Sequence, residues 1–223
     1  MPEFWDLIKT LFAVSRLHGC TSEEVNALKQ RFGQIPQAVE EFYLTAGRTK
    51  EFQDGQDKFI LPEHYKNYSW LEQVDGLVLL EENQGCCEAY IKKEDLALPD
   101  PPVYVSWEDG EAALCAASAS GFLMAALAYE AAFTFEYAPE DFYYVDGEDI
   151  EEFKSRLKQY PFKMQRWLCD TEITFYSNDP CNLVAALYSE SIEDDGLQLV
   201  YGAVTKEAYI KLERALEGVC GPF

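Results

Sequence analysis

Carboxylates are the side chains of this sequence best able to do chemistry, because it contains 40 of them. Glu81-Glu82 and Glu108-Asp109 are adjacent pairs, and Asp149 stands close to two further glutamates. A glycoside hydrolase needs two carboxylates at a set separation in one cleft. In so acidic a chain neighbouring carboxylates also arise by chance, so the pairs alone do not predict a hydrolase. Residues 141–149 lack the alternating spacing of a calcium loop, and we expect no metal site.

The histidine, cysteine and serine residues also give no clear indication of a catalytic site. Only two histidines occur, His18 near a helix end and His64 in a polar connection, and we expect both to be exposed or singly hydrogen-bonded. None of the seven cysteines forms a C-x-x-C pair, which favours reduced, packed thiols. Ser155 and Lys158 have Ser-x-x-Lys spacing without the companion motifs of penicillin-recognising enzymes. The sequence therefore predicts no catalytic residue, no cofactor and no enzymatic activity.

The charge distribution is more informative than any motif. From Glu94 to Phe153 the chain has fifteen Asp and Glu residues, eleven aromatic residues and no Lys or Arg, within a protein of net charge −22. Acidic segments without large apolar side chains stay disordered, whereas this one can bury a core and display its charge on a folded surface. Such a surface repels nucleic acid and anionic membranes and attracts a basic protein. The alternative is the general acidity of bacterial cytosolic proteins.

Acidic residues at or near turns are the expected contact points for such a partner. Trp107 adjoins one of these turns, and if exposed it would serve as an apolar anchor within an acidic rim, although a strand tryptophan is more often part of a core. The predicted partner-binding residues are Glu81, Glu82, Trp107, Glu108, Asp109, Glu140, Asp141, Asp146, Glu148 and Asp149.

The elements that position these residues begin with three helices. Apolar side chains recur at helical spacing over residues 3–17. Thr21 and Glu24 form a capping box for a second helix, which runs to Phe32 and stops at Gly33. Pro36 begins a third helix, which ends at Gly47.

Short strands separated by turns follow. An antiparallel meander is predicted by apolar runs at 77–80, 86–91, 103–107 and 112–115, with a tight turn at Asp109-Gly110. A helix follows, which is capped by Ser118 or Ser120 and extends through Tyr129. We expect a further helix from 148 to about 159, closed off by Pro161, then strands at 173–177, 183–188 and 197–202 and a helix from 205 to 216. Residues 183–188 also fit a short helix. The predicted fold class is α+β, with N-terminal helices on a mostly antiparallel sheet and a second strand–strand–strand–helix segment.

An ordered series of residues resembles the SUKH superfamily, which includes a fungal regulator of cell-wall synthesis and many bacterial immunity proteins. Phe32-Gly33 and Ile35-Pro36 look like the family's helix–glycine–proline order, and Val39 with Phe42-Tyr43 resembles its next helix. The resemblance continues through the hairpin at 82–85 with Tyr90, through Pro101-Pro102-Val103, and through Ser118 with Phe122-Leu123. It covers roughly residues 20–130. Gly47-Arg48 departs from the family's usual Gly-Gly, and nothing in residues 137–223 is matched.

The resemblance implies a non-enzymatic α+β binding domain, which we place at 1–135. From the residue pattern we expect 136–223 to form an acidic helix, a β-meander and a final helix packed on that domain. The resemblance also implies a bacterial cytosolic protein that neutralises a toxin, often a basic nuclease, and it supplies no catalytic residues. We therefore expect an immunity protein, a monomer or weak homodimer, with a basic toxin as partner. A regulatory scaffold and a carboxylate-pair hydrolase remain alternatives.

The N-terminal residues agree with a cytoplasmic location. Glu3 and Asp6 stand where an export signal would carry positive charge, and Arg16 interrupts the apolar pattern. The longest apolar run, 112–129, is rich in Ala and Ser and too weakly hydrophobic for a membrane span.

Overall fold

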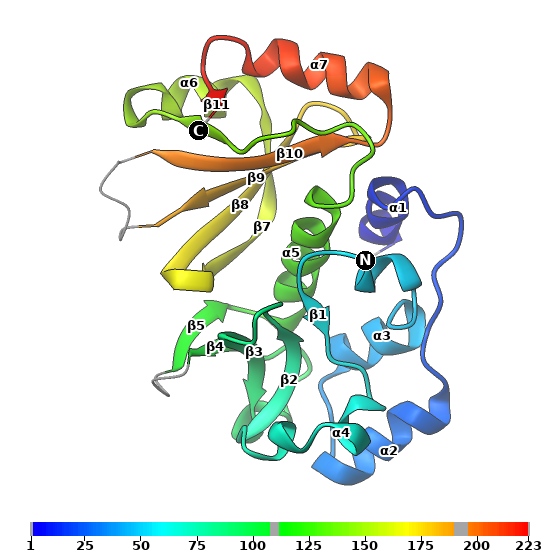
Figure 1. Ribbon diagram of the computed structural model, residues 1–223. Helices are drawn as coiled ribbons and strands as arrows, with labels where there is room; N and C mark the ends of the chain where they lie inside the picture. The colour runs from blue at the N-terminus through cyan, green and yellow to red at the C-terminus, as the bar shows by residue number, and fades with distance from the viewer. Residues whose placement is uncertain (1, 108–111, 190–195, 223) are drawn as a thin grey trace. The chain divides into compact units, whose positions relative to one another are not determined.

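A computed structural model of the chain describes residues 2–107, 112–189 and 196–222. The protein has an α+β fold with two antiparallel sheets (Figure 1). It divides into two compact units, one formed by Met1–Ser15 with Met124–Phe223 and the other by Arg16–Leu123. The chain passes between the units within helix α5 (Ala119–Ala132). The boundary between these units differs from the domain boundary expected at residue 135. The expected division into domains stays a prediction.

The Arg16–Leu123 unit contains a five-stranded sheet of order β1-β2-β3-β4-β5, with every neighbouring pair antiparallel. Its strands are β1 (Lys58–Phe59), β2 (Gly76–Glu81), β3 (Cys87–Lys92), β4 (Val103–Trp107) and β5 (Ala112–Ala116). Its helices are α2 (Ser22–Phe32), α3 (Gln37–Thr45) and α4 (His64–Asn67), with 3-10 turns η1 (Lys50–Gln53), η2 (Ser69–Glu72) and η3 (Lys93–Asp95).

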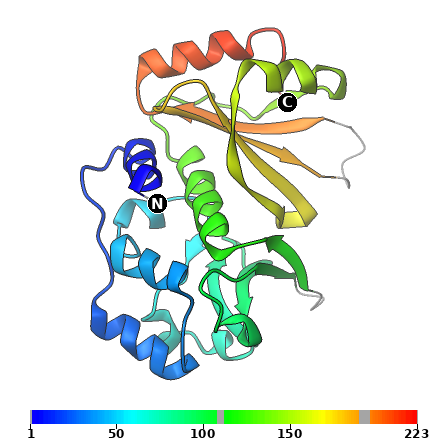
Figure 2. The same ribbon diagram turned by 180° about the vertical axis from the view of Figure 1, so that it is seen from behind.

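Local sequence determines how these helices begin and end. Thr21 accepts a hydrogen bond from the Glu24 backbone, and the Glu24 side chain accepts one from the Thr21 backbone, which confirms the predicted capping box. Gly33 follows α2 with φ +81°, a conformation that favours glycine. Tyr43 of α3 is fully buried and donates a 2.7 Å hydrogen bond to the Ile60 carbonyl. The chain turned by 180° shows α2 and α3 in blue beside this sheet (Figure 2).

The other unit contains a six-stranded antiparallel sheet of order β11-β6-β10-β9-β8-β7. Its strands are β6 (Tyr143–Val145), β7 (Lys158–Trp167), β8 (Thr171–Ser177), β9 (Asn182–Tyr188), β10 (Leu197–Ala203) and β11 (Gly221–Pro222). Its helices are α1 (Pro2–Leu11), α6 (Ile150–Arg156) and α7 (Lys206–Leu216), with 3-10 turns η4 (Gly147–Asp149) and η5 (Leu168–Asp170).

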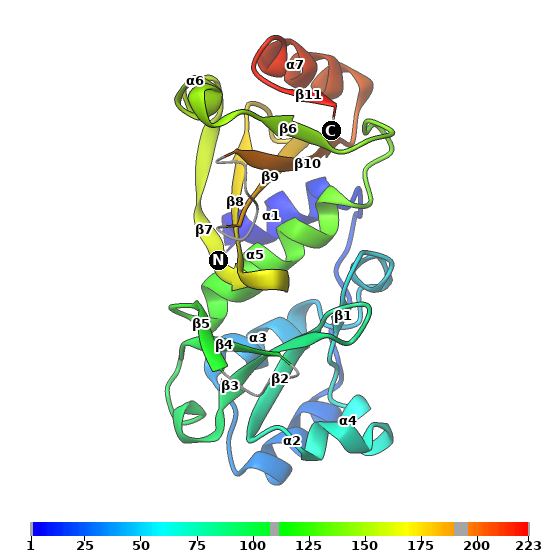
Figure 3. The same ribbon diagram turned by 60° about the vertical axis from the view of Figure 1, so that its left-hand side comes forward.

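Helices α6 and α7 lie on the same side of this sheet (Figure 3). Phe153 of α6 and Leu212 of α7 are fully buried with Val184 and Leu199 of the sheet. The Phe153 ring also meets the Tyr176 ring edge-on, with centroids 5.1 Å apart. Because burial of one such aromatic side chain contributes about 1.5–3 kcal/mol, these contacts stabilise the position of both helices.

Three expected elements differ in the structure. The first helix ends at Leu11 rather than near residue 17, and Ala13 then has a positive φ of 52°. The helix expected over 148–159 is α6, which ends at Arg156 because Leu157 is extended. Strand β7 follows, and Pro161 lies within it rather than closing off the helix. Proline is tolerated there because β7 is an edge strand whose register shifts between Gln159 and Lys163.

Strand β9 resolves the ambiguity of residues 183–188 in favour of a strand. Strands β6 and β11 were not predicted. The tight turn expected at Asp109-Gly110 lies outside the described residues. Within the described ranges, no helix combines the length and the apolar character that crossing a bilayer requires.

Candidate protein-binding surface

The densest acidic part of the chain is residues 136–152, here called the acidic β6 segment. It contains eight Asp and Glu residues and no Lys or Arg. Two backbone attachments to β10 fix its course. Tyr137 and Ala203 exchange hydrogen bonds of 3.2 and 2.8 Å, and β6 pairs with β10 from Tyr143–Leu199 to Val145–Leu197. The acids therefore flank a strand that lies between β10 and the short strand β11.

The segment leaves the sheet between these two attachments. Five residues, 138–142, lie opposite only three residues of β10, 200–202. Backbone groups alternate along a strand, so those of Tyr201 point the same way as those of Ala203, toward this loop. No hydrogen bond joins the Tyr201 backbone to residues 138–142 in the described chain. The loop thus stands away from β10.

A hollow of about 180 Å³ results, here called the Phe142 hollow. Its lining is both apolar and polar, and it includes Phe133 and Phe142 with residues 199–201 of β10 as well as Glu140 and Asp141. Phe142 is half exposed, at 50% of its surface, the largest exposure of any large hydrophobic residue in the described chain. A hollow that combines apolar side chains with carboxylates can accept an apolar side chain from a partner that is otherwise basic.

Most acids of the segment have no internal counter-charge. Glu140, Asp141, Asp146 and Glu148 are exposed and Asp149 is half-buried. None of the five forms a salt bridge with another described residue. Only the end of the segment is paired, through Glu151 with Lys154 and Glu152 with Arg156 on α6. The negative potential is felt locally, since the charge of Glu136 raises the pKa of the neighbouring Tyr137.

The remaining predicted contact residues that the structure describes, Glu81, Glu82 and Trp107, belong to the other unit and do not form such a surface. Glu82 is only 2% exposed, contrary to the expected acidic rim. Its Oε2 accepts hydrogen bonds from the Gln84 and Cys86 backbones at 2.8 and 3.4 Å, so the carboxylate stabilises the β2–β3 turn. Glu81 is half-buried and pairs with Lys58 at 3.7 Å. Trp107 is half-buried in β4, and Glu108 and Asp109 lie outside the described residues.

Four residues of the types used in nucleophilic catalysis are buried or hydrogen-bonded to the backbone: His64, Cys87, Cys20 and Ser155. His64 Nδ1 accepts a hydrogen bond from the Leu61 backbone at 3.1 Å, and burial lowers the pKa of its ring. Burial raises the pKa of Cys87 well above its usual range and that of Cys20 to about 11, so neither thiol is activated. Ser155 Oγ donates to the Glu152 carbonyl of its own helix. Across the described residues, no group of three or more His, Cys, Asp or Glu could hold a metal ion.

Phe142 is the residue of this surface that the sequence interpretation did not select. The available signal was an aromatic residue placed directly after Glu140-Asp141 in a stretch of short apolar runs. Its exposure depends on the unequal lengths of the loop and of β10, which the sequence does not reveal. Comparisons of the chain with protein-family models, with curated proteins and with solved structures give no match.

Proposed function

We propose that this protein is a non-enzymatic binding protein that captures a basic protein through the acidic β6 segment and the Phe142 hollow. The observation that carries the proposal is the set of five acids without salt-bridge partners in the described chain, next to a half-exposed Phe142. Long-range attraction speeds the encounter, and burial of an apolar contact slows dissociation. Fast association together with slow dissociation gives a low Kd, so the protein can inhibit its partner without a chemical reaction.

We further propose a bacterial cytosolic immunity protein whose partner is a nuclease-like toxin. A nuclease that binds phosphate backbones presents a cationic active site. An acidic surface that covers this site blocks substrate access and associates quickly. The SUKH resemblance supports the same function, although it lies mainly outside the acidic β6 segment. A monomer suffices for this activity, because both features belong to one unit of one chain.

The test uses a basic, nuclease-like toxin module, which we expect to be encoded beside this protein's gene. A triple charge reversal, Glu140→Lys, Asp141→Lys and Asp146→Lys, should weaken binding at least ~10-fold in low salt and abolish protection of growing cells. The matched control is Glu23→Lys, Glu51→Lys and Glu94→Lys, three exposed acids of the other unit. Both triples change the net charge equally. Equal loss in the two variants would show that bulk charge, and not this surface, determines binding.

The apolar contact requires a separate variant. Phe142→Ala should raise Kd by about 10–30-fold, mainly through faster dissociation, because a buried aromatic anchor contributes roughly 1.5–2 kcal/mol at an interface. Ile210→Ala, at an exposed position of α7, is the control. Surface plasmon resonance at two salt concentrations separates the effects. In the triple reversal at residues 140, 141 and 146, the association rate should depend less on salt. In Phe142→Ala the salt dependence of the association rate should be unchanged. A dissociation rate unchanged by Phe142→Ala would exclude the hollow from the interface.

A further inference from the structure

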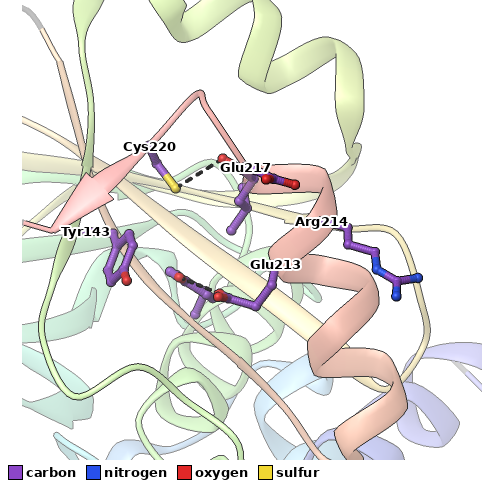
Figure 4. A pocket seen from close by; sticks show the side chains of 7 residues that line it. Tyr143, Glu213, Arg214, Glu217 and Cys220 are labelled. Atoms are coloured by element: carbon purple, nitrogen blue, oxygen red, sulfur yellow. Dashed lines mark hydrogen bonds between the residues drawn. The ribbon is translucent and has the colours of Figure 1, made fainter.

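A second cavity, of about 240 Å³, lies between the end of α7 and strands β6, β10 and β11. We call it the Glu213 pocket. Its lining includes Tyr143, Tyr201, Glu213, Leu216 and Cys220 (Figure 4). The short strand β11 brings Cys220 to this position, because Gly221 and Pro222 pair with Tyr144 and Tyr143 of β6. The volume suits one side chain or a small molecule rather than a drug-sized ligand.

The pocket combines aromatic walls with a fixed carboxylate. The rings of Tyr143 and Tyr201 meet edge-on, with centroids 5.4 Å apart and an interplanar angle of 82°. Tyr201 is buried, and its hydroxyl donates a 2.7 Å hydrogen bond to Glu213 Oε1. Burial and the nearby Glu213 carboxylate raise the pKa of Tyr209 to about 12. Glu213 is therefore held in place by the neutral Tyr201 hydroxyl.

No cation neutralises this carboxylate within the described chain. Glu213 is half-buried and takes part in none of the salt bridges between described residues. Arg214 also lines the pocket, but it is exposed, forms no salt bridge with Glu213, and its side chain extends away from Tyr143 and Glu213 (Figure 4). Arg156 donates instead to the Ala215 and Glu217 carbonyls at the end of α7. Burial raises the pKa of Cys220 to about 11, so at neutral pH the thiol adds no charge.

We propose that the Glu213 pocket binds a primary alkylammonium group, the group at the end of a lysine side chain. Tyrosine rings attract a cation through their negative faces, and Glu213 supplies the counter-charge. An ammonium fits better than a guanidinium. Glu213 Oε1 is already engaged by Tyr201, whereas a guanidinium prefers both carboxylate oxygens. The butyl stem of lysine would contact Leu216 and the aromatic walls. The assignment of this lysine to the basic partner rests on the proposed function.

Nuclear magnetic resonance titration of the full chain with n-butylammonium chloride tests the ammonium site directly. We expect shifts at the pocket residues Glu213, Glu217 and Cys220, and none with 1-butanol, which has the same stem without charge. Glu213→Gln keeps the acceptor for Tyr201 and removes the charge, and it should weaken binding at least ~10-fold. Glu207→Gln, in the first turn of α7, is the control and should leave binding unchanged.

Other outcomes would overturn the site. Equal shifts with 1-butanol would indicate an apolar pocket without cation recognition, and unchanged binding in Glu213→Gln would remove the carboxylate from it. Nα-acetyl-lysine methylamide distinguishes the source of the ammonium. If it fails to bind where butylammonium binds, the site serves a free amine and the lysine assignment is wrong. The charge-reversal test at residues 140, 141 and 146 is independent, so either proposal can fail while the other stands.

Discussion

At the scale of single residues, Arg48 is the most heavily paired cation of the Arg16–Leu123 unit. Its guanidinium contacts both Glu24 and Glu63. Hydrogen bonds from Arg48 and from the Thr21 backbone lower the pKa of Glu24 from 4.5 to about 2. The folded state therefore binds a proton less readily than the unfolded state. The ion pair contributes its full stability above about pH 4.5 and loses it as the pH falls toward 2.

We predict that Glu24→Gln lowers the free energy of unfolding by about 0.5–1 kcal/mol at pH 7, a range set by the partial exposure of the pair. Glutamine keeps the capping-box hydrogen bond, so the loss reports the charge. At pH 2 the variant and the parent should differ little. Urea denaturation at several pH values measures the effect, with Glu23→Gln as the control in the same helical turn. A loss that persists at pH 2 would mean that charge is not its cause.

Glu81 and Glu82 show what residue-level interpretation of the sequence lacks. Two adjacent carboxylates before a turn were predicted to be exposed together. Instead Glu81, in β2, contacts Lys58, whereas Glu82 folds into the turn and accepts backbone hydrogen bonds. Charge alone predicts exposure, but the backbone N–H groups of a tight turn are also stabilised by a carboxylate acceptor. The sequence does not distinguish these two uses of a glutamate.

At the scale of elements, Gly202 determines how closely β10 and the start of the acidic β6 segment approach each other. A Cβ atom there would lie 2.6 Å from the Tyr137 carbonyl oxygen and 2.8 Å from Phe135 Cβ. Neither atom is the end of a flexible side chain. The Tyr137–Ala203 bridge, which anchors the loop of the Phe142 hollow, would have to open or shift.

Gly202→Ala is accordingly expected to lower the free energy of unfolding by roughly 1–3 kcal/mol, as overpacking does. Gly221→Ala is the control, because nothing lies within 4 Å of its added Cβ. Denaturation measures stability, and amide hydrogen exchange at Tyr137 and Ala203 should accelerate in the Gly202 variant alone. Unchanged exchange at these two amides would show that the bridge does not depend on the missing Cβ.

Elements with local signals were predictable, and those defined by distant pairing were not. The helix after Thr21 has its capping residues and its stop within a dozen positions, and it forms as expected. Strand β6 has only three residues, too few to show alternation, and it exists because β10 and β11 pair with it. Strand β7 contains Pro161, which normally argues against a strand. The candidate surface depends on β6, so its acids were predictable but its hollow was not.

At the scale of the whole molecule, a net charge of −22 disfavours the compact state through self-repulsion. A surface kept acidic for binding is expected to reduce stability where its charges have no partners. Glu140, Asp141 and Asp146 meet this condition among the described residues. Asp146, which precedes η4, makes no side-chain capping hydrogen bond either. Removing their charges therefore costs no hydrogen bond that the structure shows.

We predict that the neutral triple Glu140→Gln, Asp141→Asn and Asp146→Asn is as stable as the parent or more stable by up to about 1 kcal/mol in low salt. The difference should shrink as salt rises, because at about 0.1–0.15 M salt the added ions screen the repulsion between charges more than about 8–10 Å apart. Thermal denaturation across a salt series measures it, with Glu23→Gln, Glu51→Gln and Glu94→Gln as the control for net charge. The neutral triple at residues 140, 141 and 146 should lose affinity for the basic partner while gaining stability. The control triple should keep its affinity. A triple that is less stable at every salt concentration would show that these carboxylates support the fold, and a binding role would then no longer be needed to explain them.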